Sequence, residues 1–315
     1  MDHHIDIVEQ QIHELDPELL SILLRDETTG QNIRWACEDY ASLGTGYSPE
    51  DQILPELITG ENTNVIRPRI MKEAETQAGR TREKAEVFTP SWVCNKQNNL
   101  IDEAWLGKSP VFNREENKGW TPVKKQITFP RQKGRHWQDY VTANRMEITC
   151  GEAPYLVSRY DTVTGEAIPL MARIGFLDRK LRIISERVEE PDRWFDWAQK
   201  ALQSCYAYDI QGDNVLLARE NVLASVSEYH VGQFGVPLSK DQLRRVAIII
   251  AWNIWQMNGL TYTAPFSEES VINDQADWFS EMGGQVELKQ EIPCCIMDWQ
   301  EEKVIQYQTL VKGQR

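Results

Sequence analysis

The sequence lacks most features that mark metal-binding, secreted and membrane proteins. It has five histidines and six cysteines among 315 residues, and no cysteines have zinc-site spacing. The sequence contains no run of about eighteen apolar residues, the length that a membrane span needs. Its polar start, MDHHIDIVEQ, is unlike a signal peptide. Internal repeats and low-complexity stretches are missing too. These absences predict a cytoplasmic protein with reduced thiols.

Positive charge is also scarce. The 48 Asp and Glu residues outnumber the 34 Lys and Arg residues, which gives a net charge of −14. Phosphate contacts need clustered cations, so this charge argues against a stand-alone nucleic-acid-binding protein. Two local exceptions are the basic clusters within residues 67–84 and 124–135. Either cluster could contact phosphate, or could simply be a solvated helix face or loop.

Hydrophobic spacing divides the chain into three regions. Residues 1–85 read as a helical region, with helices predicted over 32–40 and within 64–81. Residues 86–265 form a mixed core that opens with a turn and an amphipathic helix. Residues 266–315 form a C-terminal extension, which we expect to contact a partner.

The core alternates short apolar stretches with helical segments. MEITC, SCYAYDI and VAIIIAWNIWQ read as strands, and PDRWFDWAQKALQ and GDNVLLARENVLASVSEYH between them read as helices. The segment RIGFLDRKLRII could be an inserted hairpin with an exposed turn at its charged DRK. Strands that alternate with helices are typical of a parallel sheet wrapped by helices, so we expect an α/β fold.

Residues with useful chemistry lie at the ends of the first two predicted strands. Glu147 lies in the first strand, which runs into a tight turn at Cys150 and Gly151, and Asp209 follows the second strand. The carboxyl ends of parallel strands form the usual ligand crevice. A glycine turn there exposes backbone N–H groups, and a carboxylate can accept both hydroxyls of a ribose. Each acid could equally be an ordinary cap or turn residue.

Four segments, in order, resemble the N6-adenine (amino-methylating) DNA methyltransferases of restriction–modification systems. EVFTPSWVCNKQNNLID resembles the FTP motif, which in that family packs over the methionine end of S-adenosylmethionine (AdoMet). EITCGEAPYL resembles the first cofactor motif, typically DPACGSGAFL. SCYAYDIQGDN resembles the second motif and IAWNIWQMNGL the third. The resemblance covers residues 64–262.

The resemblance implies a Rossmann-like, AdoMet-dependent methyltransferase core. Asp209 would hold the ribose hydroxyls, and Asn258 would recognise the adenine ring. Ala153 departs from the family, because it replaces the second glycine of the loop. The implied cofactor-binding residues are Phe88, Thr89, Pro90, Glu147, Cys150, Gly151, Tyr155, Asp209, Ile210 and Asn258.

The largest departure is a missing motif. The family's catalytic tetrapeptide, Asn/Asp-Pro-Pro-Tyr/Phe, is absent, because the sequence has no Pro-Pro pair. Adenine N6 is a weak nucleophile, so the family flips the base and aligns its amino group with that tetrapeptide. CCIMDW at residues 294–299 resembles the segment that precedes the tetrapeptide in fused enzymes. The resemblance therefore implies a split enzyme whose second subunit brings the catalytic motif.

Three hypotheses stay open at this point. The first is the AdoMet-binding subunit of a heterodimeric adenine-specific DNA methyltransferase, which would contact double-stranded DNA largely through the complex. The second is a catalytically inactive, methyltransferase-like interaction or regulatory protein. The third is a stand-alone methyltransferase with another class of substrate. AdoMet binding separates the first two, and a neighbouring gene that encodes Asn-Pro-Pro-Tyr would separate the first from the third.

Overall fold

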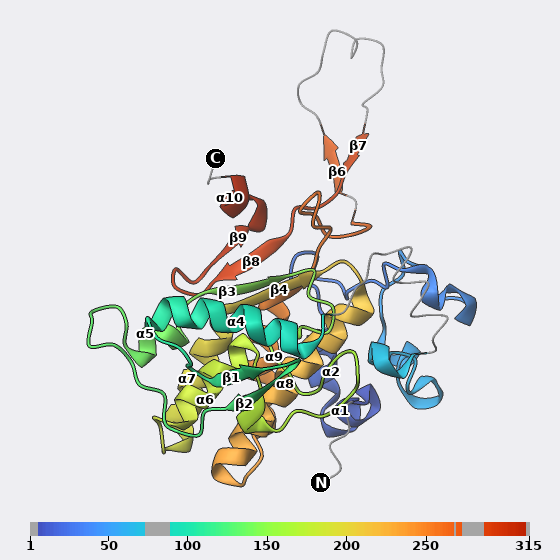
Figure 1. The fold of residues 1–315 in the computed structure, drawn as a ribbon. Helices are drawn as coiled ribbons and strands as arrows, with labels where there is room; N and C mark the ends of the chain where they lie inside the picture. Colours follow the sequence, from blue (N-terminus) through green and yellow to red (C-terminus); the bar gives the residue numbers. More distant parts are fainter. Residues whose placement is uncertain (1–5, 73–88, 268, 273–286, 313–315) are drawn as a thin grey trace.

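The computed structural model describes residues 6–72, 89–267, 269–272 and 287–312 and combines helices with small sheets (Figure 1). No helix in these ranges is long and apolar enough to cross a membrane. The α-helices are α1 (Glu9–Leu15), α2 (Pro17–Leu24), α4 (Ser91–Leu106), α5 (Trp137–Val141), α6 (Phe176–Ser185), α7 (Pro191–Gln203), α8 (Gly212–Phe234), α9 (Lys240–Asn253) and α10 (Tyr307–Lys312). The strands are β1 (Asn113–Glu116), β2 (Gly119–Pro122), β3 (Arg145–Ile148), β4 (Cys205–Asp209), β5 (Ile254–Gln256), β6 (Glu269–Ile272), β7 (Glu287–Gln290), β8 (Cys295–Asp298) and β9 (Lys303–Gln306). Short 3-10 turns are η1 (Glu38–Leu43), η2 (Pro55–Leu57), η3 (Gly60–Asn62), η4 (Arg69–Met71) and η5 (Leu170–Ala172).

The central sheet has three parallel strands in the order β3-β4-β5. Helices α6 and α7 connect β3 to β4, and helices α8 and α9 connect β4 to β5. The register pairs Ile148 with Tyr208 and Asp209 with Gln256, so the carboxyl ends of all three strands meet at one edge. The expected strand–helix alternation and the parallel sheet are therefore present.

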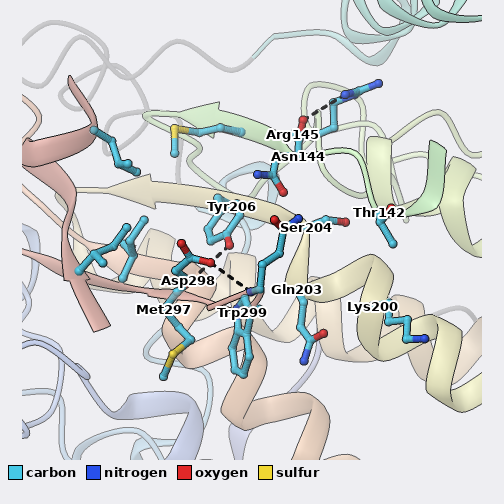
Figure 2. A pocket seen from close by; sticks show the side chains of 15 residues that line it. Thr142, Asn144, Arg145, Lys200, Gln203, Ser204, Tyr206, Met297, Asp298 and Trp299 are labelled. Atoms are coloured by element: carbon cyan, nitrogen blue, oxygen red, sulfur yellow. Dashed lines mark hydrogen bonds between the residues drawn. The ribbon is translucent and has the colours of Figure 1, made fainter. Parts of the chain in front are cut away.

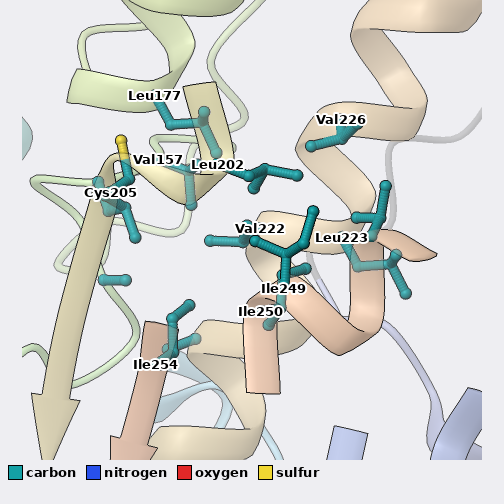
Figure 3. Packing of buried hydrophobic residues seen from close by; sticks show 14 of the residues in the cluster. Val157, Leu177, Leu202, Cys205, Val222, Leu223, Val226, Ile249, Ile250 and Ile254 are labelled. Atoms are coloured by element: carbon teal, nitrogen blue, oxygen red, sulfur yellow. The ribbon is translucent and has the colours of Figure 1, made fainter. Parts of the chain in front are cut away.

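The two faces of the sheet are buried by different clusters, because successive side chains of a strand point to opposite faces. Cys205 and Ala207 of β4 belong to a large cluster packed with side chains of helices α6 to α9 (Figure 3). Tyr208 belongs to a smaller cluster with Trp255 and Tyr307. Figure 1 shows the β8–β9 hairpin and α10 on the face of β3 and β4 opposite those helices. The C-terminal segment thus covers the second face.

The prediction of a strand over VAIIIAWNIWQ is wrong for most of its length. Helix α9 starts after Ser239, whose hydroxyl accepts from Gln242 N in a capping box, and it continues to Asn253. Only residues 254–256 extend, as β5. A continuous apolar run fits a buried helix as well as a buried strand. The upstream cap favours the helix here.

The segment that could be a hairpin with an exposed turn is helix α6, and its charges are buried. Asp178, Arg179 and Lys180 are each at most 1% exposed. Asp178 accepts a hydrogen bond from Ser158 N at 2.7 Å, and Lys180 Nζ donates to Ser204 Oγ at 2.7 Å. Burial lowers the pKa of Lys180 to about 8. The partners are distant in sequence, so local pattern gives no sign of them.

Helix α4 is the helix expected after the FTP turn, although its buried stripe is polar. Asn95, Asn99 and Asp102 lie at helical spacing and converge on Arg179. Arg179 Nη2 donates to Asn95 Oδ1 at 2.9 Å and to Asn99 Oδ1 at 2.8 Å, while its Nη1 pairs with Asp102. Tyr140 donates to the same carboxylate at 2.6 Å. This buried ion pair is tolerable because its oxygens are hydrogen-bonded, and it fixes α4 against α6.

The N-terminal region is only partly helical. The helix predicted over 32–40 is wrong, since isolated bridges pair Arg25 with Asn32 and Arg34 with Gln52, and only η1 follows. Within 64–81, the described part holds only the short turn η4, after which the backbone at Lys72 is extended. Residues 73–81 lie outside the described ranges. Tertiary contacts override weak helical periodicity in this region.

Candidate functional site

The carboxyl ends of β3 and β4 bring the glycine turn and Asp209 into contact. Cys150 N donates to Tyr208 O at 2.9 Å, which places the turn beside β4. Gly151 N then donates to Asp209 Oδ2 at 2.9 Å, and Gln211 N donates to Asp209 Oδ1 at 3.0 Å. Two residues that were predicted from separate motifs are therefore neighbours.

The turn itself has an unusual backbone. Thr149, Gly151 and Ala153 have φ angles of 48°, 54° and 62°. Glycine adopts this left-handed region freely, whereas other residues lose roughly 1–2 kcal/mol there. Ala153 is fully buried. The backbone at Ala153 thus has a conformation typical of glycine. The methyltransferase family that the sequence resembles has its second loop glycine at this position.

Glu147 supports the turn from inside the protein. Its carboxylate accepts from Tyr155 N at 3.2 Å and from Leu156 N at 2.9 Å. Burial raises the pKa of Glu147 to about 8; the two backbone donors oppose this shift and the nearby Asp209 adds to it. Cys150 is buried beside these acids, and burial raises the pKa of its thiol well above the usual value. Glu147 therefore holds the loop through the loop backbone, and the Cys150 thiol is buried beside it.

The FTP segment lies against the same loop. Asn98 Nδ2 of α4 donates to Tyr155 O at 3.2 Å, and burial raises the pKa of Tyr155 to about 12. Thr162 Oγ1 donates to Thr89 O at 3.3 Å. Phe88, which the resemblance also implies as a cofactor-binding residue, lies outside the described residues. The start of α4 and the glycine turn are thus brought together from distant parts of the chain.

Two acids outside the predicted set hold this arrangement. Asp161 Oδ2 accepts from Ser91 N at 2.8 Å, directly after Pro90 and at the first residue of α4. Although burial raises the pKa of Asp161, hydrogen bonds from backbone N–H groups such as that of Ser91 leave it below the usual value. Glu152 accepts from Arg69 N at 2.6 Å and from the Tyr160 hydroxyl at 2.7 Å. In the sequence, Asp161 could close a cofactor pocket or only cap a helix, and its bond to Ser91 N shows that it caps α4. Glu152 reads as an ordinary turn residue.

Ile210 and Asn258 lie at the ends of β4 and β5. Ile210 follows Asp209 directly and its side chain is 41% exposed. Asn258 closes a turn in which its Oδ1 accepts from Leu260 N at 3.0 Å and its backbone N donates to Thr263 O at 2.9 Å. A ligand could therefore contact the side-chain nitrogen of Asn258 or the second lone pair of its Oδ1.

The described residues of the two basic clusters lie in different places, and residues 73–84 of the first cluster are outside the described ranges. In the first, Lys72 Nζ donates to Asp213 Oδ2 at 2.9 Å near the start of α8. In the second, Arg135 Nη1 donates to Trp105 O at 2.7 Å near the C-terminal end of α4. Thr89 lies at the other end of this 16-residue helix, which is about 24 Å long. The second cluster is thus remote from the glycine turn.

No protein-family model, curated protein or solved structure matches the chain. Within the described residues, no three His, Cys, Asp or Glu side chains gather in a group that could hold a metal ion. The four sequence motifs and the geometry at the strand ends are therefore what indicates the function of the chain.

Proposed function

We propose that this chain is the AdoMet-binding subunit of a split, heterodimeric N6-adenine DNA methyltransferase with a Rossmann-like core. The observation that carries the proposal is the 2.9 Å hydrogen bond from Gly151 N to Asp209, which joins two of the resembling motifs across 58 residues. Helix α4, which follows the FTP turn of a third motif, contacts the same loop through the hydrogen bond from Asn98 to Tyr155 O. Ligand sites of open parallel sheets form at this end of the strands.

The residues at this edge fit the chemistry of AdoMet. The Asp209 carboxylate suits ribose hydroxyls, because hydrogen bonds to a charged acceptor are strong. The exposed Ile210 offers an apolar surface to the adenine ring. When bound, AdoMet supplies the methyl group that is transferred to adenine N6.

The contribution of this chain is binding and orientation. Glu147 holds the turn through two backbone N–H groups, and Asp161 holds the start of α4 beside it. The sequence contains no Pro-Pro pair, so a partner subunit would align the adenine amino group for transfer. Double-stranded DNA would be bound largely by the complex, in the cytoplasm.

Calorimetric titration with AdoMet tests the proposal. Replacing Asp209 with alanine should weaken AdoMet binding by about 1.5–3 kcal/mol, the usual contribution of a hydrogen bond to a charged group. Asp192→Ala is the matched control, because Asp192 is exposed in the first turn of α7. Unchanged affinity of the Asp209→Ala variant, in the assembled enzyme as well, would contradict the assignment.

A catalytically inactive, methyltransferase-like regulatory protein is the second candidate. The observation that favours it is Ala153, whose buried methyl group occupies a left-handed position in the cofactor loop. If the natural chain fails to bind AdoMet and Ala153→Gly binds it, the loop has decayed and the regulatory function is favoured. If neither binds, the cofactor proposal is wrong.

A further inference from the structure

The central sheet has two edge strands, β3 and β5; the Arg34 backbone lies against β5 through hydrogen bonds with the Gln256 side chain, and β3 is the more open of the two. Strand β3 pairs only with β4, and no other strand in the described ranges lies on its outer side. Arg145 N donates to Ser204 O at 2.9 Å, toward β4. The N–H groups of a strand alternate in direction, so those of Met146 and Ile148 point away from β4. Edges of this kind are templates for another strand.

The side chains at this edge are exposed as well. Met146 is 37% exposed and Ile148 is 62% exposed, on the face that carries the β8–β9 hairpin. On the opposite face, Glu147 is buried. Parallel sheets are normally covered on both faces, so apolar exposure on β3 is unusual for such a strand.

A cavity of about 430 Å³ adjoins the start of this edge. Figure 2 shows it between the residues that precede β3 and β4 and those of β8. Its apolar lining includes Met146, Tyr206, Met297, Ile305 and Leu310. Leu310 is 46% exposed, so the lining is open to an incoming group. The cavity and the open edge of β3 form one continuous surface through Met146.

We infer that this surface receives an extended strand of the partner subunit, which pairs in parallel with β3 and places an apolar side chain in the cavity. The inference rests on the proposed split enzyme. The direction follows from chemistry, since a catalytic loop can stand beside Gly151 only if its strand ends where β3 ends. A strand parallel to β3 begins beside the cavity and ends beside the glycine turn.

A strand is the occupant that fits, because only an extended backbone can satisfy the alternating N–H groups of β3. A second copy of this chain fits less well. Two identical edges related by a two-fold axis normal to the sheet would pair antiparallel and would carry each turn away from the other. A charge of −14 on each copy also opposes association, whereas a basic, DNA-binding partner would be attracted.

Amide exchange measured by NMR gives the first test. In the chain alone, the amides of Met146 and Ile148 should exchange at least tenfold faster than that of Cys150, which donates to β4. The heterodimer is made with the product of a neighbouring reading frame that contains Asn-Pro-Pro-Tyr. In it, the amides of Met146 and Ile148 should become at least tenfold slower. Unchanged exchange in a formed heterodimer would overturn the inference and leave the split enzyme standing.

A blocking experiment gives the second test. Ile148→Cys, labelled with a bulky maleimide, should weaken the heterodimer at least tenfold without altering AdoMet binding by the chain alone. Val236→Cys is the matched control, because Val236 is 52% exposed and follows α8. Labelling of the parent chain measures reaction at the native thiols, of which only Cys295 is not buried. Equal affinity of both labelled variants would overturn the inference, and failure of any heterodimer to form would overturn the split enzyme too.

Discussion

The two sides of the central sheet differ in how the chain closes them. On the β5 side, the Gln256 side chain accepts from Arg34 N at 2.8 Å and donates to Arg34 O at 2.7 Å. A bridge between Thr263 and Pro293 brings the C-terminal segment to the same side. On the β3 side, the described residues provide no strand partner. The closed side serves stability, and we assign the open side to association.

A buried cation holds the closed side together. Arg219 of α8 is fully buried and donates to Ile254 O of β5 at 2.8 Å and to Ala251 O of α9 at 3.2 Å. It also donates to Leu23 O at 2.7 Å and Arg25 O at 2.8 Å, at the end of α2. Burial lowers the pKa of Arg219 to about 10. One side chain thus ties the N-terminal helices to the sheet.

The largest expected effect is therefore on the closed side. Arg219→Met should lower the free energy of unfolding by roughly 3–5 kcal/mol, because several buried carbonyl groups lose their donor. Ile148→Thr, on the open edge, should change it by less than about 0.5 kcal/mol, as surface substitutions usually do. Urea denaturation of the chain alone measures both. Similar losses for the two variants would contradict the distinction between the sides.

A pH effect of intermediate size should come from Glu147 on β3. Its pKa is raised in the folded protein from 4.5 to about 8, so the native state binds the proton more tightly and stability falls as pH rises through this range. The slope is at most about 1.4 kcal/mol per pH unit. Glu147→Gln should lose this slope, while Glu189→Gln, on the exposed surface, should keep it. Denaturation midpoints between pH 5 and pH 8 check the prediction, and parallel profiles would refute it.

The smallest expected effect is at Ala153 in the turn beside the open edge. Ala153→Gly should stabilise the chain by roughly 0.5–1 kcal/mol, since relief of the left-handed φ exceeds the added entropy of the unfolded chain. Ala198→Gly, in the buried interior of α7, should instead destabilise it by about 1 kcal/mol or more. Thermal unfolding at one pH measures both. A loss of stability in Ala153→Gly would show that the buried methyl group outweighs the strain.

The local sequence pattern was sufficient to predict those helices and strands whose residue spacing alone favours them. The helical segments PDRWFDWAQKALQ and GDNVLLARENVLASVSEYH are α7 and α8. The stretches around Glu147 and Asp209 are β3 and β4, because each is a short apolar run that ends in a turn. Strand ends in a parallel sheet meet by topology, so the contact of Gly151 with Asp209 was within reach of the sequence as well.

Features that depend on partners far away in the sequence, such as the burial of charged side chains, were decided by the tertiary structure alone. Asp178, Arg179 and Lys180 read as an exposed turn, yet they are buried because partners more than fifteen residues away satisfy their charges. The extended path at Arg34 has the same origin, since its hydrogen bonds with the distant Gln256 side chain outweigh a weak local preference for helix. The sequence by itself thus determined the parallel core and the residues at its strand ends. Long-range hydrogen bonds and burial decided which side of that core is closed, because their free energy exists only once the chain has folded.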